Sequence, residues 1–464
     1  VSFINESPSS QLRIAENSTG NEFNGTTILD NGTSQTASSR AVHLCKENSA
    51  TLTINGIIYF NNNGSAGIYF GENGGQTIIN TSNFSTLSGY LGGTLSFKNS
   101  TFNQSTVLDF LTDDAILSFG PNTISNAPLS TNSPSLLLNG LTTHADAEFI
   151  KFGGLNDLSL GGNVFNSLVS YENVSTGNLN LAGSLNDTYS NEVTITTNST
   201  GNIDISHTES AIANADLVFN SFNPLLFGSN NGQLHIIGNQ IQEFTNLGTE
   251  IPIIHNIRMD KSTNDLTLNC PIHIGTSSEF INGKIVTSSL NYIQYLDNSI
   301  VSATFPANNN SFVNGPVRKA GDDFFIFPIG KQDQYRPCAI ENPSLITDVF
   351  TAEYFPANSN GLYPHISRVS TINNISTCDY WTIDRTNGAS NVEVYLSWST
   401  PGCNGIVDLN SLIVSRWDAT LSEWQDHGNG GVSGDAMNGN IRSFTTINTF
   451  SPFALASIDA INPL

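Results

Sequence analysis

Five acidic residues in the first third of the chain have the type and spacing for hydrolytic chemistry. They are Asp109, Asp113, Asp114, Asp146 and Glu148. Glycoside hydrolysis needs only two carboxyl groups at a suitable separation, and the adjacent Asp113 and Asp114 are the first candidate pair. The same residues are also typical of solvated corners between strands, and we expect that simpler role for them.

Lyase chemistry on an acidic polysaccharide would need a basic residue to abstract a proton and cations to hold the polymer. Between Lys46 and Arg258, however, the only Lys or Arg residues are Lys98 and Lys151. This scarcity of cations argues strongly against a lyase.

Other catalytic and metal-binding patterns are missing from the sequence. Five histidines are scattered through the first part of the chain with no two spaced to bind one metal ion: His144, His207, His235, His255 and His273. No serine stands in a GxSxG context, including Ser65, Ser96 and Ser159. We therefore predict a protein that is not an enzyme, with no catalytic residue, no cofactor and no metal site.

Structural calcium stays open as an alternative. Asp322 and Asp323 follow Gly321, and Asp426 with Asp435 forms a second group later in the chain, so carboxylate oxygens are available to the ion. Aspartates are equally common in turns without any ion, and we favour that role.

Aromatic and sulfur-containing residues in the last third of the chain allow two interpretations each. Exposed aromatic rings would stack on sugars, but alternating strand positions favour core packing for Tyr380, Trp381, Trp398, Trp417 and Trp424. Cys378 and Cys403 stand at corresponding edges of two strand-like segments, so a disulfide between them is plausible. We expect Cys45 and Cys270 to be buried thiols.

The overall composition limits the possible partners. Charged residues make up 12% of the 464 residues, against roughly 25% in an average soluble domain, which suits an extracellular surface wetted by amides and hydroxyls. A formal net charge of −23 disfavours nucleic acid and anionic membranes. The apolar runs are too short for a membrane span: Phe324–Phe327, for example, is followed at once by Pro328.

The elements that must position these residues are short strands. Period-two triplets such as Ile68–Phe70, Leu95–Phe97 and Leu179–Leu181 recur through about residue 310, separated by Asn, Gly, Ser and Thr. Triplets at intervals of roughly 20–25 residues predict an all-β fold whose first part, residues 1–310, is a right-handed parallel β-helix. A stack of antiparallel sandwiches is the alternative, with longer strands and clear hairpins.

Residues 311–464 differ from the first part in composition and in strand length, and this pattern predicts an antiparallel β-sandwich. Tryptophan occurs only here, and strands lengthen to Asn391–Trp398 with clean alternation. Val392, Val394, Leu396 and Trp398 would point to one buried face.

Several segments of the second part resemble the carboxy-terminal region of Bacteroidetes surface proteins exported by the type IX secretion system, often described as gliding-motility or adhesin-like proteins. The segments are SFVNGPVRKAGDDFFIFPIGK from Ser311, FTAEYF from Phe350, YWTIDR from Tyr380, VYLSW from Val394 and SPFALAS from Ser451. Coil segments such as NDLSLGGNVFNS from Asn156 extend the resemblance to most of the chain. It implies export to the outer cell surface through a carboxy-terminal sorting domain, which we expect to be missing after Leu464.

These observations together predict a non-enzymatic extracellular protein, an adhesin or structural stalk of elongated form. Its expected partners are cell-surface or extracellular glycans or proteins, together with the type IX secretion machinery. A secreted polysaccharide-binding or polysaccharide-degrading β-helix protein remains the alternative.

Overall fold

The computed structural model shows an all-β fold: a parallel β-solenoid of about 13 turns, followed by antiparallel sheets that fit a β-sandwich. The predicted fold class is therefore confirmed. The structure describes residues 1–6, 10–32, 40–62, 66–82, 84, 89–90, 92–112, 114–223, 225–341, 343–399 and 405–464. These residues form no α-helix and two short 3-10 helices, η2 (Ser359–Gly361) and η3 (Leu409–Ser411). Among them, no helix has the length and hydropathy of a membrane span.

The chain forms two compact units. The first unit comprises Val1–Ile236 and Glu243–His255, and the second comprises Ile237–Gln242 and Asn256–Leu464.

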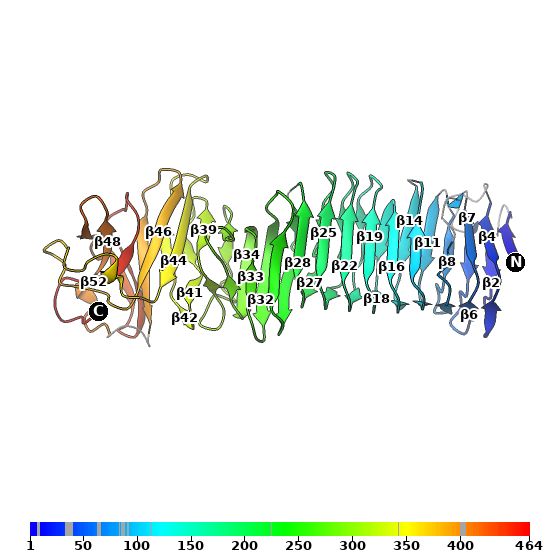
Figure 1. Ribbon diagram of the computed structural model, residues 1–464, viewed down its shortest axis with the longest axis horizontal. Helices are drawn as coiled ribbons and strands as arrows, with labels where there is room; N and C mark the ends of the chain where they lie inside the picture. Colours follow the sequence, from blue (N-terminus) through cyan, green and yellow to red (C-terminus); the bar gives the residue numbers. More distant parts are fainter. Residues whose placement is uncertain are drawn as a thin grey trace. The chain divides into compact units, whose positions relative to one another are not determined.

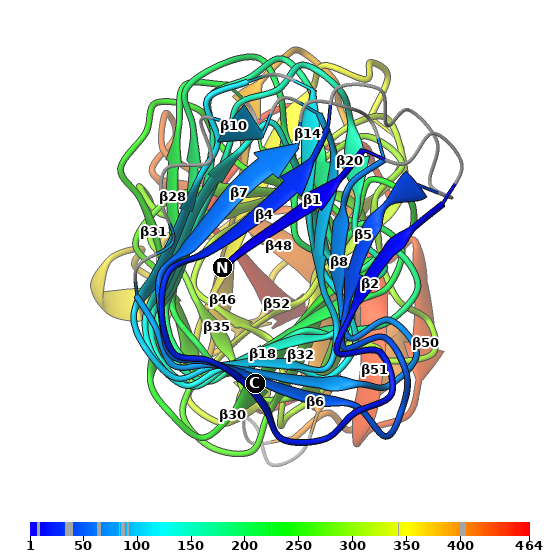
Figure 2. The ribbon, with the colours of Figure 1, turned by 90° about the vertical axis from the view of Figure 1, so that its right-hand side faces the viewer.

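Strands of the first unit lie on three faces, and each coil contributes a short strand to each face (Figures 1 and 2). One face contains β1 (Ser2–Asn5), β4 (Thr27–Asn31), β7 (Ile58–Asn62), β10 (Gly89–Tyr90), β13 (Thr106–Asp109), β16 (Leu129–Ser133), β19 (Ala147–Lys151), β22 (Val169–Asn173), β25 (Val193–Thr197), β28 (Leu217–Ser221) and β31 (Gln242–Asn246). The second contains β2 (Leu12–Ile14), β5 (Val42–Leu44), β8 (Ile68–Phe70), β11 (Gly93–Phe97), β14 (Ala115–Phe119), β17 (Ser135–Leu138), β20 (Asp157–Leu158), β23 (Leu179–Asn180) and β26 (Ile203–Asp204).

The third face contains β3 (Asn21–Phe23), β6 (Thr51–Ile54), β9 (Gln76–Ile79), β12 (Ser100–Phe102), β15 (Thr123–Ser125), β18 (Leu141–Thr143), β21 (Val164–Phe165), β24 (Asp187–Tyr189), β27 (Ser210–Ala213) and β30 (Gln233–Gly238). The strand β29 (Leu226–Phe227) pairs with the start of β32 (Ile253–Lys261). All these pairings are parallel, which contradicts the alternative of stacked antiparallel sandwiches.

Inward side chains of successive coils stack in register. Phe149, Tyr171, Ile195 and Phe219 pair in this order across β19, β22, β25 and β28, and all four are fully buried. The rings of Phe149 and Tyr171 lie 5.5 Å apart. Side chains alternate between the two faces of a strand, so the neighbours of each inward residue on its own strand face solvent. A triplet with two inward apolar residues is therefore enough for each strand to contribute to this core.

Asparagines form a second, external column at the corner that follows the third face. The side-chain amide of each asparagine donates to the side-chain oxygen of the asparagine one coil earlier, at 2.7–2.9 Å. The column, called here the asparagine ladder, contains Asn24, Asn55, Asn80, Asn103 and Asn126. It ties consecutive coils together without any charged group.

In the second unit, parallel pairing gives way to antiparallel pairing. The parallel part contains β33 (Leu266–Leu268), β34 (Ile272–Asn282), β35 (Ile285–Val286), β36 (Ile293–Tyr295), β37 (Ile300–Val301), β38 (Val313–Asn314), β39 (Val317–Ala320) and β41 (Ile329–Lys331). Parallel pairing thus continues to Gly330, beyond the domain boundary predicted at residue 310. That boundary stays a prediction about where an independent domain begins.

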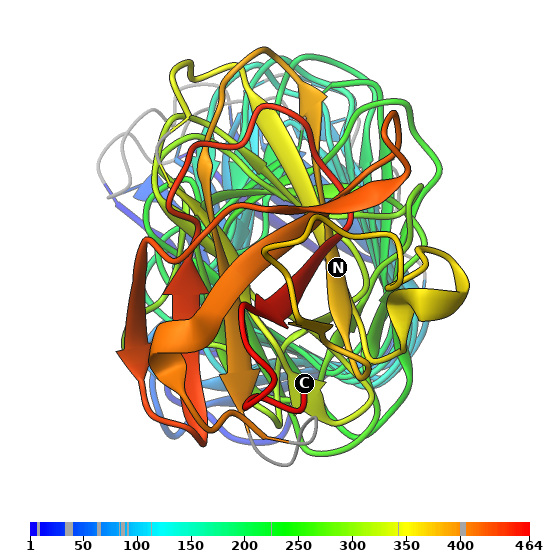
Figure 3. The same ribbon diagram turned by 90° about the vertical axis from the view of Figure 1, so that its left-hand side faces the viewer.

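The antiparallel strands of the second unit make two sheets (Figure 3, yellow to red). One has the order β40 (Phe325–Phe327), β43 (Cys338–Glu341), β47 (Glu393–Ser399), β51 (Asn438–Arg442) and β50 (Gly431–Gly434). The other is built from β44 (Val349–Phe355), β45 (Asn374–Ile375), β46 (Tyr380–Asn387), β48 (Leu412–Asp418), β49 (Glu423–Asp426) and β52 (Phe453–Ser457); β42 (Gln334–Tyr335) pairs with β41. The predicted buried face of Val392, Val394, Leu396 and Trp398 is confirmed.

Candidate functional site

Two of the predicted acidic residues come together on the outer face of the first unit. Asp146 and Glu148 line a hollow of about 370 Å³ over β16, β19, β22 and β25, and Glu192 is the third carboxylate in its lining. Asp146 accepts a hydrogen bond from Ser167 Oγ at 2.6 Å, and Glu148 accepts one from Ser130 Oγ at 2.8 Å. This acidic hollow is the site that best matches the predicted hydrolase chemistry.

The remaining acidic candidates lie elsewhere. Asp109 accepts a hydrogen bond from the Asn132 side-chain amide at 2.8 Å and does not line the acidic hollow. Asp114 is exposed, and Asp113 lies outside the described residues. The predicted pair of Asp113 and Asp114 therefore stays a prediction.

Lys151, one of the two cations in the basic-poor interval, is fully buried. Its ammonium group lies 3.4 Å from the carboxylate of buried Asp157 and donates to the carbonyl oxygens of Pro134 and Gly153. Burial lowers the pKa of Lys151 and raises the pKa of Asp157. The lysine thus stabilises the interior and is not presented to a ligand.

Possible metal ligands gather at one place in the described part of the chain. Asp322 and Asp323, for which calcium binding was the alternative, lie with Asp297 so that their carboxylate oxygens are within 4.8 Å of one another. Asp323 already binds Lys319 Nζ at 2.7 Å and accepts the Asn298 N–H at 2.9 Å. The group is a cluster of turn aspartates, one of which is neutralised by a lysine.

The other two aspartates considered for calcium, Asp426 and Asp435, stabilise turns. Asp426 accepts the N–H of Gly428 at 2.8 Å, and Asp435 accepts the N–H groups of Met437 and Asn438 at 2.7 and 2.9 Å. Both aspartates thus have the turn role that we favoured for them.

The cysteines divide into buried thiols and one disulfide half. Cys45 and Cys270 are buried thiols that form no disulfide, as predicted, and Cys338 is a third. Cys378 is disulfide-bonded. Cys403 lies outside the described residues, so its pairing with Cys378 stays a prediction.

The tryptophans and Tyr380 belong mainly to the core of the second unit. Trp381 and Trp424 are fully buried, and Tyr380, Trp398 and Trp417 are less than 10% exposed. Tyr380, Trp417 and Trp424 share one hydrophobic cluster. Their burial favours core packing over sugar stacking.

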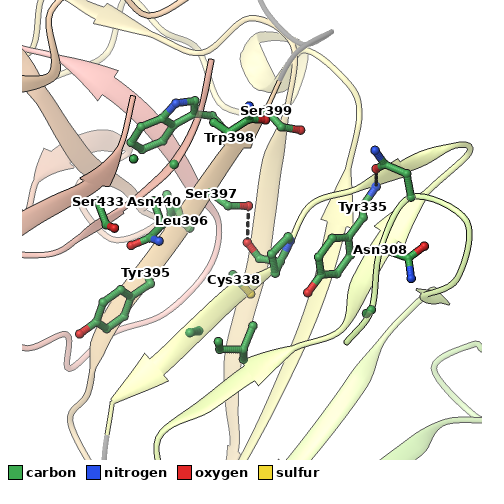
Figure 4. A pocket seen from close by; sticks show the side chains of 18 of the residues that line it. Asn308, Tyr335, Cys338, Tyr395, Leu396, Ser397, Trp398, Ser399, Ser433 and Asn440 are labelled. Carbon is green, nitrogen blue, oxygen red and sulfur yellow. Dashed lines mark hydrogen bonds between the residues drawn. The ribbon is translucent and has the colours of Figure 1, made fainter. Parts of the chain in front are cut away.

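A cavity of the second unit lies on the outer face of its five-stranded sheet, a site that the sequence did not reveal. This sheet-face hollow has a volume of about 590 Å³. Its lining combines apolar and aromatic side chains with amides and hydroxyls, among them Phe324, Ile326, Tyr335, Tyr395, Trp398, Asn308, Asn440, Ser397 and Ser433 (Figure 4).

Antiparallel register brings these residues onto one face. Ile326, Ala339, Tyr395 and Arg442 are paired across β40, β43, β47 and β51, so their side chains share a side of the sheet. A second row contains Ser397, Asn440 and Ser433. Figure 4 shows Tyr395 and Tyr335 on two sides of the hollow, and the Ser397 hydroxyl donates to the Pro337 carbonyl at 2.6 Å between them.

Several polar groups in the hollow are available to a ligand. The side chains of Asn440 and Ser433 are exposed and make no hydrogen bond within the described part of the chain. Trp398, by contrast, donates its indole N–H to the carbonyl of Asp435 at 2.8 Å, which fixes the ring. A Cβ at Gly439 would overlap that ring, so glycine is required there.

The lining contains no Asp, Glu, Lys, Arg or His among the residues that the structure describes. Its ionisable groups are Tyr335, Tyr395 and Cys338, and burial raises the pKa of each. Charged side chains lie beside the hollow: Arg442 forms ion pairs with Glu393 and Glu341 at 2.8 and 3.4 Å. The Tyr395 hydroxyl donates to Glu341 at 2.7 Å and lowers the pKa of that carboxyl.

A weak signal for the hollow exists in the sequence. In Phe324–Phe327, both alternating positions are apolar: Phe325 and Phe327 are buried, whereas Phe324 and Ile326 are 46% and 47% exposed. Apolar residues on the solvent face of a strand are typical of a contact surface. Comparison of the chain with protein-family models, with curated proteins and with solved structures found no match.

Proposed function

We propose that this protein is a non-catalytic extracellular surface protein, an adhesin or structural stalk, that makes contact with glycans. The observation that carries this proposal is the lining of the sheet-face hollow. Aromatic and apolar faces there adjoin amide and hydroxyl groups, with no acidic or basic side chain among the described lining residues. Sugar rings have apolar C–H faces and a rim of hydroxyls, so this lining complements them.

The outer surface of the first unit supports a contact role. Amides of the asparagine ladder and hydroxyls of the strands face solvent, which gives many neutral hydrogen-bonding groups. Individually weak contacts of this kind add up when a surface presents them repeatedly. The burial of Lys151 removes one of the few cations that an enzyme acting on acidic polymers would use.

The extracellular location and the link to type IX secretion are part of this proposal. They rest on the resemblance of the segments in the second unit to Bacteroidetes surface proteins. All five segments contribute strands to the antiparallel sheets: the segment from Ser311 contains β40, FTAEYF lies in β44, YWTIDR in β46, VYLSW in β47 and SPFALAS around β52. The surface protein would reach its partners outside the cell.

A glycan array and affinity measurements with purified protein test the proposal. We expect binding to neutral glycans that persists at about 1 M salt, because no charged group lines the hollow. We also expect no new reducing ends after prolonged incubation with the bound polysaccharide. Failure to bind any glycan would contradict the proposal.

A polysaccharide-degrading enzyme is the second candidate, and the acidic hollow is the observation that favours it. Asp146 and Glu148 are hydrogen-bonded carboxyl groups on an accessible outer face. Release of reducing ends by the native protein, abolished in both Asp146→Asn and Glu148→Gln, would establish this function instead.

A further inference from the structure

A second hollow lies beside the sheet-face hollow and shares part of its lining. The second one, called here the side hollow, has a volume of about 290 Å³, and its lining includes Ile300, Val301, Pro306, Phe324, Ile326 and Tyr335. Phe324, Ile326 and Tyr335 line both hollows. The two cavities therefore adjoin along a shared apolar wall.

The joined surface is long enough for an extended ligand. From Ser433 on β50 to Ile326 on β40 the sheet-face hollow crosses five strands. Four strand spacings of about 4.8 Å give a length of about 19 Å before the side hollow begins. A single sugar ring would fill only part of it.

The residues that line the two hollows change from polar at one end to apolar at the junction. Exposed Asn440 and Ser433 lie at one end, where their side chains are free to hydrogen-bond. Phe324 and Ile326 lie at the junction with the side hollow, and the Phe324 ring packs edge-to-face against Tyr395 at 5.6 Å. The exposed part of that ring offers a flat apolar surface on which a ring of the ligand can stack.

A peptide strand is a poorer fit than a glycan. Peptides commonly add to the edge of a sheet through main-chain hydrogen bonds. Here the groove runs over the face, across strands whose backbone groups already pair with one another. Side chains alone are offered to the ligand.

Charge beside the groove selects against acidic ligands. Glu341 and Glu393 share a single cation, Arg442, and therefore leave one net negative charge next to Tyr395. The formal charge of the whole chain is −23. A carboxylated or sulfated sugar would be repelled there, whereas a neutral sugar would not.

We propose that the sheet-face hollow and the side hollow form one groove for a linear, uncharged glycan chain, held by Asn440 and Ser433 at one end and stacked on Phe324 at the junction. This inference rests on the proposed glycan contact and specifies its site, its ligand class and its minimum length.

Calorimetry with neutral oligosaccharides from the monosaccharide to the hexasaccharide, on the full chain, tests the groove. Affinity should rise with length until both hollows are filled and then level off. Phe324→Ala should weaken binding of every length about three- to tenfold. Ile300→Ser, in the side hollow, should weaken binding only of the longer chains.

Phe444→Ala is the matched control, because Phe444 is 71% exposed in the same unit and lines neither hollow. It should leave affinity unchanged, and circular dichroism should show that all three variants fold. Binding without length dependence, or insensitive to Phe324→Ala, would overturn the groove while leaving glycan contact in place. Tighter binding of uronic-acid oligomers or of a peptide would also overturn it, and absence of all glycan binding would overturn the proposed function too.

Discussion

Asp187 is a fully buried carboxyl group at the start of β24 in the first unit. Burial raises its pKa to about 7, although the backbone N–H and side-chain amide of Asn163 donate to it at 2.8 and 2.9 Å. The folded protein therefore holds a proton that the unfolded chain releases near its ordinary value of 3.8. Such a group couples stability to pH.

We expect Asp187 to make the protein less stable as pH rises from about 4 to about 7. In this range the folded state binds more protons than the unfolded state, so the free energy of unfolding falls with pH and levels off above pH 7. Asp187→Asn lacks this titration. The melting temperature of the native protein minus that of the variant should be largest near pH 4 and should shrink by pH 7; a constant difference would contradict the prediction.

Lys151→Met should destabilise the first unit by about 3–5 kcal/mol, because it leaves the Asp157 carboxylate buried without its cation. The double variant Lys151→Met with Asp157→Asn should recover much of that loss, since no charge is then buried alone. Urea unfolding of the single and double variants measures both effects. Equal stability of the two variants would show that the ion pair is not the cause.

At the scale of elements, we expect the loss of stability on replacing an asparagine of the ladder to depend on its position in the ladder. Asn80 donates to Asn55 and accepts from Asn103, whereas Asn126 only donates, to Asn103. Asn80→Ala should therefore cost about 1 kcal/mol, and Asn126→Ala about half as much, given the modest net value of exposed hydrogen bonds. Denaturant titrations of the two variants compare an interior and a terminal position, and equal costs would argue against the ladder.

Strand positions were predictable from local patterns, and so was the side of each strand that is buried. Leu95 and Phe97 are both fully buried, as the triplet predicts. The burial of Lys151 had a signal as well, because it has the same parity as the buried residues Ala147 and Phe149 on β19. The burial of Lys151 was nevertheless not predicted, because lysine is rarely buried unless it is paired with an opposite charge.

The sheet-face hollow was not predictable in this way. Tyr335, Tyr395 and Asn440 are far apart in the sequence and meet only through the order and register of β40, β43, β47, β51 and β50. Alternation within a strand says which side chains share a face, but not which strands become neighbours. The sequence therefore predicted one strand of this sheet, Asn391–Trp398, which corresponds to β47, and did not predict the cavity on the sheet.

At the scale of the whole molecule, the solenoid predicts tolerance to loss of a complete coil. Val169, Val193 and Leu217 occupy equivalent positions in successive coils. Deleting Val193–Asp216 places Leu217 where Val193 was, and each coil contacts mainly its neighbours. The variant should fold, with a melting temperature within about 10 °C of the native protein.

Deleting Val193–Gly201 provides the control, because it removes β25 and leaves β26 and β27 in place. That coil can no longer close, so the core column would be interrupted. Circular dichroism and melting curves should show a severe loss for this shorter deletion. If the complete deletion is equally damaging, the coils are not interchangeable.

The burial of Lys151 also affects digestion of the protein by proteases. Trypsin-like enzymes cut after lysine or arginine, and between Lys98 and Arg258 the chain contains only Lys151. Because that residue is fully buried, the folded protein offers such enzymes no accessible cleavage point within this stretch. Most of the first unit is thereby shielded from a common class of digestive enzyme.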